Sequence, residues 1–284
     1  MKRSFVIVLC LAMIICLWQS LASAGGPPPK TTSCGNGDGS ANNPIKICTQ
    51  ADFTAMRTWP ASHFVLGNSI DLTPDWTPIL SFEGTFDAKY HWIVGLPAPF
   101  IQDNYGTVKN LVAKKANVVG NGTIANVNLG RLTSVYAEGN VQGGVKNGGL
   151  VGVNKGVIEW SQFTGEIQGT AISGGIAGYN EATGSIKQSN AGGTSGAFST
   201  AGGLVGTNAG SIKDSYAWGI ASSSSGTVGG LVGRNHATGV IANSVATGDV
   251  HTMDTAIEIG KLVGLNSGKI IRSYGTGQIV LYNG

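Results

Sequence analysis

The stretch "GGLVGTNAGSIKDSYAWG", residues 202–219, decides the fold because the chain repeats it. Close copies begin at residues 148, 174, 229 and 260, so the period is 26 to 31 residues. A period of this length indicates a solenoid, a propeller or an array of small units. Because a propeller blade needs about 40 residues for its four strands, these shorter copies favour a solenoid.

Each copy begins with an apolar pair and a glycine, which predicts a short strand followed by a glycine corner. Asparagine tolerates left-handed backbone angles, and its amide can bond the backbone, so it suits such a corner. In stacked coils, identical asparagines are expected to form a structural ladder like those of cross-β stacks. The asparagines, two residues after that glycine, are Asn154, Asn180, Asn208, Asn235 and Asn266.

Each copy continues with an aliphatic residue, a serine three residues later, and a glycine four residues after the serine. One coil cannot bury its aliphatic residue alone, but stacked coils bury these residues in a continuous core. The sequence therefore predicts an all-β parallel β-helix, or β-solenoid, of about eight coils. The serines, which we expect to belong to the structural ladder, are Ser161, Ser189, Ser215, Ser244 and Ser273.

The pattern Gly-Gly-Leu-Val-Gly-x-Asn-x-Gly-x-Ile-x-x-Ser-Tyr-Ala-x-Gly, carried by 202–219 and echoed by 260–277, resembles the GLUG repeat of bacterial exported proteins. The resemblance implies a right-handed parallel β-helix in secreted or cell-surface proteins that are often associated with adhesion. Residues 68–96 are similar to the segment that leads into such repeats. There the usual glycine-rich turn is replaced by "AKYH" (88–91).

Four segments are expected along the chain: a signal peptide at 1–24, a flexible lead segment at 25–43, an N-terminal cap with the first coils at 44–97, and the repeat β-helix at 98–284. The signal peptide is indicated by two basic residues, an apolar run too short to span a membrane, and small residues that allow cleavage after Ala24. We therefore expect a secreted, periplasmic or cell-surface protein that does not span a membrane once mature. A short helix over 49–58, with Thr49 as its N-cap, is expected to cover the first coil.

The two cysteines outside the signal peptide, Cys34 and Cys48, are expected to form a disulfide in an exported chain, with two free thiols as the alternative. No cofactor or metal is expected, because the cysteines and the four histidines show no ligand spacing. The formal net charge of the full sequence is only +3, which disfavours a nucleic-acid partner.

Candidate ligand-binding residues are the aromatic side chains at variable positions of the repeat: Trp218, Trp160, Tyr216 and Tyr274. Aromatic rings offer an apolar face with a polar rim, which suits stacking on sugar rings. Trp218 also stands where other copies carry threonine. As an alternative, Tyr216 and Tyr274, which both follow a serine, could stack on one another along the solenoid.

These observations predict an exported binding or adhesion module that is not an enzyme and whose partner is an extracellular glycan or a host or cell-surface protein. The alternative is a polysaccharide-degrading enzyme, which needs paired carboxylates. Its candidates are the acidic residues near His91, although turn capping also explains two of them, Asp71 and Asp87. The apolar C-terminal stretch "GQIVLYNG" (277–284) predicts self-association through the last coil, or another partner that covers it. The four candidate carboxylates are Asp71, Asp75, Glu83 and Asp87.

Overall fold

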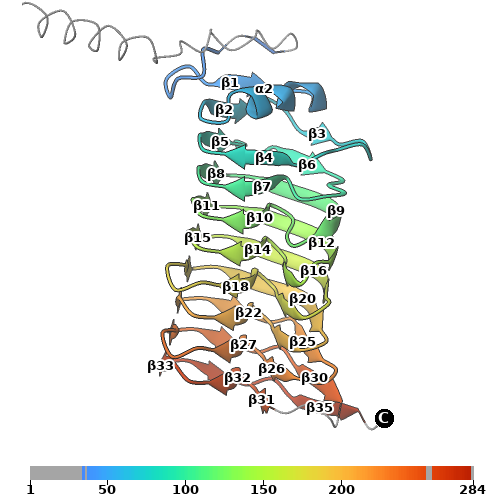
Figure 1. The fold of residues 1–284 in the computed structure, drawn as a ribbon, viewed down its shortest axis with the longest axis vertical. Helices are drawn as coiled ribbons and strands as arrows, with labels where there is room; N and C mark the ends of the chain where they lie inside the picture. The colour runs from blue at the N-terminus through green and yellow to red at the C-terminus, as the bar shows by residue number, and fades with distance from the viewer. Residues whose placement is uncertain (1–33, 36, 254–257, 283–284) are drawn as a thin grey trace, which may run out of the picture.

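The computed structural model of the chain describes residues 34, 35, 37–253 and 258–282. The expected signal peptide at 1–24 and residues 25–33 of the expected lead segment lie outside them. The described residues form a rod of stacked coils, with β1 (Ile45–Ile47) near one end and β35 (Ile279–Tyr282) at the other (Figure 1). The prediction of an all-β parallel β-helix of about eight coils with a short N-terminal helix is thereby confirmed.

The strands of the described residues form four sheets. Within each sheet, a strand pairs in parallel with the equivalent strand of the neighbouring coil. The first sheet is β1, β2 (His63–Leu66), β5 (Thr85–Asp87), β8 (Thr107–Lys109), β11 (Arg131–Thr133), β15 (Val157–Glu159), β19 (Ser185–Lys187), β23 (Ser211–Lys213), β28 (Val240–Ala242) and β33 (Lys269–Ile271). The second sheet is β4 (Ile79–Phe82), β7 (Ile101–Asn104), β10 (Ala125–Asn128), β14 (Val151–Asn154), β18 (Ala177–Asn180), β22 (Val205–Asn208), β27 (Val232–Asn235) and β32 (Val263–Asn266).

The remaining two sheets complete the circuit of each coil. The third sheet is β3 (Ile70–Asp71), β6 (Trp92–Val94), β9 (Val112–Gly120), β12 (Tyr136–Gly143), β16 (Gln162–Gly169), β20 (Asn190–Ala197), β24 (Tyr216–Ala217), β29 (Val245–Ala246) and β34 (Tyr274–Gly275), with β25 (Ile220–Ser223), β30 (Val250–Met253) and β35 continuing from β20. The fourth sheet is β13 (Lys146–Gly148), β17 (Ile172–Gly174), β21 (Thr200–Gly202), β26 (Thr227–Gly229) and β31 (Glu258–Gly260).

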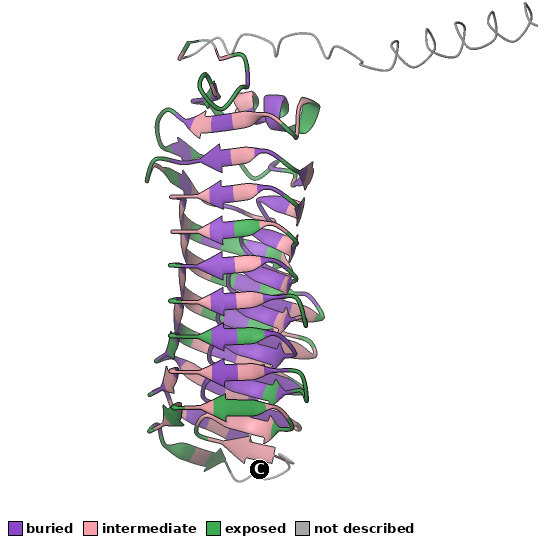
Figure 2. Cartoon of the chain, turned by 90° about the vertical axis from the view of Figure 1, so that its left-hand side faces the viewer, coloured by how far each residue is buried: buried purple, intermediate pink, exposed green. Residues whose placement is uncertain are grey.

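The core is a set of inward columns, one residue for each coil, because alternate side chains of a strand point to opposite faces. In the first sheet this column changes from aromatic to branched aliphatic along the rod, and its members pair in register. Figure 2 shows this buried interior running along the length of the rod. The fully buried members are Phe64, Phe86, Val108, Leu132, Ile158, Ile186, Ile212 and Ile241.

A short cap covers the first coil. It consists of the 3-10 helix η1 (Gln50–Asp52) and α2 (Phe53–Thr58). The carboxylate of Asp52 accepts hydrogen bonds from the backbone N–H groups of Cys48 and Thr49, which stabilises the start of the cap. The ring of Phe53 packs against Trp76 and Phe100, with centroid distances of 5.2 and 5.4 Å. The cap therefore closes the core at this end of the rod.

We expected the chain to turn a corner at the glycine after the apolar pair, and this prediction is wrong. Gly206 lies inside β22, and its equivalents lie inside the corresponding strands of the other copies. A Cβ atom on Gly206 would lie 2.7 Å from the carbonyl oxygens of Gly178 and Ser173, so only glycine fits where these backbones approach. The corner follows the asparagine that ends the strand.

The asparagines of the repeat lie at the ends of the second-sheet strands and form a ladder along the rod, in which all but the last, Asn266, are buried. The Nδ2 group of Asn154 donates to Oδ1 of Asn180 at 2.8 Å, and the same contact recurs from Asn180 to Asn208, Asn235 and Asn266. Asn104 and Asn128 extend the ladder upstream. Each Nδ2 group also donates to a backbone carbonyl after the corner, so the ladder holds both its own strand and the next.

The serines form a second ladder at the corner between the first and third sheets. The backbone N–H of Ser161 donates to Oγ of Ser189 at 3.2 Å, and this pattern continues through Ser215 and Ser244 to Ser273. Each hydroxyl in turn donates to the carbonyl two residues earlier in its own coil, as Ser161 does to Glu159. The serine therefore satisfies backbone groups that a sharp corner leaves unpaired.

The two ends of the rod differ. At the N-terminal end, the predicted disulfide between Cys34 and Cys48 is present beside the cap. In the last described coil, Ile270 of the inward column is 37% exposed, whereas its partner Ile241 is fully buried. Figure 2 shows the same contrast between the exposed last coil and the buried coils above it.

Candidate functional site

The candidate ligand-binding residues lie on the outward face of the third sheet, where three rows of side chains run from coil to coil. We call this surface the third-sheet face. Its corner row is Tyr90, Asn110, Ser134, Trp160, Gln188, Asp214, Asn243 and Arg272. Its first strand row is Trp92, Val112, Tyr136, Gln162, Asn190, Tyr216, Val245 and Tyr274. Its second strand row is Val94, Lys114, Glu138, Thr164, Gly192, Trp218, Thr247 and Thr276.

The corner row points outward because its backbone is left-handed. Trp160 has a φ of 54°, and the other members have φ values between 45° and 62°. This conformation is uncommon for residues other than glycine, and here it turns the chain between the first and third sheets. The residues two and four positions further along the chain also face outward, because side chains alternate along a strand. Except for Gly192, all members of the three rows are half-buried or exposed.

All four predicted residues lie on this face, and Tyr216 and Tyr274 point outward. Trp160 and Tyr274 are each 59% exposed, and Tyr216 and Trp218 are each 37% exposed. Tyr216 pairs with Val245, which in turn pairs with Tyr274, so the two tyrosines are two coils apart. The alternative that they stack directly on one another is therefore wrong.

The Tyr216–Trp218 pair is the best-defined part of the face. The two rings stack with centroids 5.5 Å apart and an interplanar angle of 27°. The hydroxyl of Tyr216 is hydrogen-bonded to Oγ1 of Thr247 in the next coil. The indole lies over Gly192 of the preceding coil, where a Cβ atom would be 2.2 Å from ring atoms of Trp218. Gly192 therefore makes the room in which the indole lies flat along the sheet.

Three aromatic residues of this face were missed by the sequence analysis: Tyr90, Trp92 and Tyr136. Tyr136 occupies the same register position as Tyr216 and Tyr274, but the serine that marks this position in the repeat is replaced by Val135. Tyr90 and Trp92 belong to the coil with the altered turn sequence "AKYH". An alignment of the upstream coils on the inward column would have found all three.

The upstream aromatic side chains surround a shallow hollow of about 390 Å³, which Tyr90, Tyr136 and Trp160 line together with glutamine and asparagine side chains. Trp92 lies one coil before Val112, with which it pairs. The ammonium group of Lys114 lies over the ring of Trp92, with Nζ 3.4 Å from the ring centroid. A cation held over one face of the indole restrains its orientation. The rings are thus held by neighbours from adjacent coils.

The polar members of the third-sheet face are mostly uncharged. Nine of its positions carry amide or hydroxyl side chains, and four carry charges, two acidic and two basic. Asp214 accepts a hydrogen bond from the amide of Asn243 at 2.9 Å and lies 3.8 Å from Lys213. The face therefore combines aromatic rings with neutral donors and acceptors, and its own charges cancel.

The carboxylates of the alternative hypothesis do not gather at one site. Asp71 and Asp75 line an open hollow beside α2, whereas Glu83 lines a different hollow with His63 and Tyr105. Asp75 is hydrogen-bonded to Thr73 and Gln50, which lowers the pKa of its carboxyl group.

The side chain of Asp87 lies in a corner and is only 12% exposed. The ammonium groups of Lys89 and Lys109 lie 3.1 and 3.4 Å from its carboxylate. Burial acts to raise the pKa of Asp87, but hydrogen bonds from Asn110 and Lys89 and the charge of Lys109 outweigh it and lower the pKa. Asp87 is therefore held ionised as a structural partner of its neighbours, in agreement with the turn-capping interpretation.

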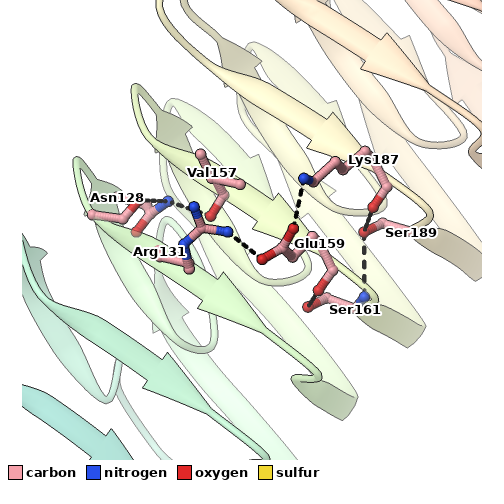
Figure 3. Close-up of polar contacts among 8 residues, drawn as sticks. Asn128, Arg131, Val157, Glu159, Ser161, Lys187 and Ser189 are labelled. Carbon is pink, nitrogen blue, oxygen red and sulfur yellow. Dashed lines mark hydrogen bonds and ion pairs between the residues drawn. The ribbon is translucent and has the colours of Figure 1, made fainter.

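A second structural ion pair crosses three coils of the first sheet (Figure 3). The carboxylate of Glu159 contacts Arg131 of the preceding coil and Lys187 of the next, the latter at 2.8 Å. Burial acts to raise the pKa of Glu159, but the hydrogen bonds from Lys187 and Arg131 outweigh it and lower the pKa. The two cations thus tie three coils through one ionised side chain.

Neither a metal centre nor a membrane-spanning helix was found in the part of the chain that the structure describes. Within it, no group of three or more His, Cys, Asp and Glu side chains is placed to hold a metal ion. None of its helices combines the length and apolar character that a membrane span requires. The disulfide indicates an oxidising compartment, as in exported proteins.

Comparison with known proteins confirms the resemblance stated from the sequence. The GLUG motif matches residues 224–250. A crystal structure described as a candidate immunoglobulin A1 protease from Bacteroides ovatus has a TM-score of 0.63 and 23% sequence identity, over 87% of this chain and 79% of that chain. A structure named IgA1 protease has a TM-score of 0.50 and 22% identity, over 84% of this chain but only 21% of that chain. No curated protein sequence matches the chain.

At this identity the two structures establish the shared fold, so the chain is a β-helix protein that carries a GLUG motif. They also correct one expectation. We predicted that the protein is not an enzyme, and this prediction is contradicted because both structures of the same fold carry the name of a protease. A β-helix of this kind therefore gives no ground for excluding enzymatic activity.

Proposed function

We propose that the chain is an exported binding protein that recognises an extracellular glycan through the third-sheet face. The observation that carries this proposal is the gathering of seven aromatic side chains among neutral amide and hydroxyl groups on one outward face. Five Trp and seven Tyr residues lie in the described part of the chain, and more than half of these twelve are on this face. Rings bury apolar area at little cost in conformational entropy, and amides and hydroxyls can pair with sugar hydroxyls.

Co-sedimentation tests the proposal. Residues 25–284, with the disulfide intact, are incubated with insoluble cell-wall, matrix and host-type polysaccharides, and both the retained protein and the size of the glycan afterwards are measured. We expect retention, and we expect Trp218→Ala and Trp160→Ala to weaken it. Tyr105→Ala is the matched control, because Tyr105 is 52% exposed but lies away from the face. Loss of retention in the control alone would contradict the proposal.

The same experiment also tests the alternative that the protein degrades the glycan. Shortened glycan would indicate a polysaccharide-degrading enzyme, and attention would pass to Asp71, Asp75 and Glu83. Unchanged glycan with retained protein would support binding. Absence of retention on every glycan would overturn the proposal and favour a host or cell-surface protein as the partner.

A second candidate function is participation in proteolysis, and the names of the two similar structures favour it. The chain corresponds to about a fifth of the larger structure, so in that setting the β-helix would be one part of a longer enzyme. Incubation with immunoglobulin A1, followed by analysis of heavy-chain fragments, tests this candidate. New fragments would support it, and an intact heavy chain alongside glycan retention would favour the first proposal.

A further inference from the structure

We infer that the third-sheet face binds a neutral glycan chain that lies parallel to the axis of the β-helix and contacts aromatic side chains of several coils at once. This inference rests on the proposed function and adds to it the orientation, the charge class and the minimum length of the ligand. It extends the site beyond the four residues predicted from the sequence, to Tyr90, Trp92 and Tyr136.

The register of the third sheet sets the length of the site. Trp92 and Tyr274 occupy the same position in the first strand row and are separated by seven pairing steps. At ~4.8 Å for each step, the aromatic row is on the order of 34 Å long. A ligand that uses the whole row is therefore an extended polymer rather than a mono- or disaccharide.

The distribution of the rings decides the orientation. Rings occur on five of the eight coils that form the face, and no more than one coil without a ring separates neighbouring members. Across a single coil, a chain would meet two rings at most, as at Tyr90 and Trp92 or at Tyr216 and Trp218. Along the axis it meets all five coils. The greater contact area is thus obtained only by a chain that runs along the rod.

Local contacts favour the same direction. The indole of Trp218 lies over Gly192 of the preceding coil, and the hydroxyl of Tyr216 bonds Thr247 of the following coil. The hollow between Tyr90, Tyr136 and Trp160 also spans several coils. These rings and polar groups therefore bridge coils and line a path parallel to the axis.

The charges of the face select a neutral ligand. Lys114 lies over the ring of Trp92, and Asp214 is held by Asn243 and Lys213. The other two charged members, Glu138 and Arg272, are opposite in sign. A face whose charges cancel gives no net attraction to a uronic-acid or sulfated polymer, whereas its amides and hydroxyls match the hydroxyl groups of a neutral one.

The test measures affinity against ligand length. Short and long neutral gluco- and manno-oligosaccharides are titrated against residues 25–284 by calorimetry, with polygalacturonate and sulfated dextran as charged comparators. Contacts added along one chain act at high effective concentration, so we expect affinity to rise roughly tenfold or more once the ligand approaches the length of the row. We expect Trp92→Ala and Tyr274→Ala, at the two ends, each to weaken long ligands several-fold and short ligands little. Tyr105→Ala is the control, and circular dichroism verifies the fold of each variant.

Each outcome is decisive. Binding whose strength does not rise with length, or which is insensitive to both end variants, would overturn the axial orientation while leaving the proposed function standing. Preference for the charged polymers would overturn the assignment of a neutral ligand. If the oligosaccharides and the insoluble glycans all fail to bind, the proposed function itself is wrong.

Discussion

At the scale of single residues, the repeat separates positions that build the coil from positions left free to vary. Asn208 and Ser215 are buried in ladders, and side-chain hydrogen bonds fix their identity. The amide of Asn208 donates to Asn235 of the next coil, and the hydroxyl of Ser215 accepts from the backbone N–H of Ser189 in the preceding coil. Trp218 stands at an outward position where Thr164 and Thr247 stand in other coils. The sequence alone indicated this difference, because repetition within one chain shows which positions vary. It could not show that Gly192 makes room for the indole, since that contact joins different coils.

We predict that Gly192→Ala weakens glycan binding without unfolding the protein. The added Cβ would lie 2.2 Å from the indole of Trp218 and would displace it, and the ring is free to move because it is at the surface. Loss of the ordered ring pair corresponds to about 1 kcal/mol, or roughly fivefold in affinity. Calorimetry measures the affinity, and tryptophan fluorescence reports the displacement. Gly196→Ala is a suitable control, because its nearest neighbour would be 3.7 Å away.

We predict that Glu159 makes the stability of the rod depend on acidic pH. Its pKa is lowered in the folded state, so its ionised form stabilises the fold above the ordinary value of 4.5, and this stabilisation is lost as the pH falls through the lower folded value. Glu159→Gln removes this contribution, which is about 0.5 kcal/mol for each partly exposed pair. Thermal melts should therefore show a lower Tm than wild type at neutral pH and a smaller difference in acid. An equal difference at every pH would contradict the assignment.

At the scale of strands and ladders, the sequence predicted the parallel stacking well and the position of the corners poorly. The period and the buried aliphatic column followed from the pattern. The glycine after the apolar pair was misplaced, because glycine marks both turns and close approaches of backbones, and only the second applies at Gly206. The register that joins Tyr136 to Tyr216 and Tyr274 could not be predicted, because the upstream coils keep the inward column but lose the serine that marks the corner.

We predict that removing an amide from the middle of the asparagine ladder costs more than removing one from its end. Asn208→Ala leaves the donor of Asn180 and the acceptor of Asn235 unpaired in a buried site, at a cost of about 2 kcal/mol. Asn266→Ala affects an exposed residue that water can replace, and should cost less than ~1 kcal/mol. Urea unfolding of both variants compares the two. Equal destabilisation would show that the ladder contributes through something other than buried hydrogen bonds.

At the scale of the whole molecule, the first and last described coils differ in how far their apolar side chains are covered. The cap with Phe53 and the disulfide close the first coil. The last coil presents apolar side chains such as Ile279 and Leu281, which are 41% and 52% exposed. The stacking of the coils and their approximate number could be predicted from the repeats. The site could be predicted only in part, because the third-sheet face is made by residues from eight coils.

We predict that the exposed apolar side chains of the last described coil support self-association of residues 25–284. Apolar side chains on an unpaired sheet edge favour contact with another surface, and two copies can bury them together. Sedimentation velocity of residues 25–284 should show an average mass that rises with concentration, and Ile279→Lys with Leu281→Lys should suppress the rise. Leu80→Lys, at a site 76% exposed in the second sheet, is the control. A single monomeric species at high concentration would contradict the prediction.

The most direct test of the third-sheet face as the binding site is the set of indole N–H resonances of residues 25–284, recorded by NMR while a retained glycan is added. Trp92, Trp160 and Trp218 lie on the face, whereas the indole of Trp76 is buried against Phe53 of the cap and donates to the carbonyl of Pro99. We predict that the three surface resonances shift together and saturate with the ligand, while that of Trp76 stays in place. Saturable binding that leaves all three unchanged, or that shifts only Trp76 or Trp59, the residue at the end of α2, would show that the glycan binds elsewhere.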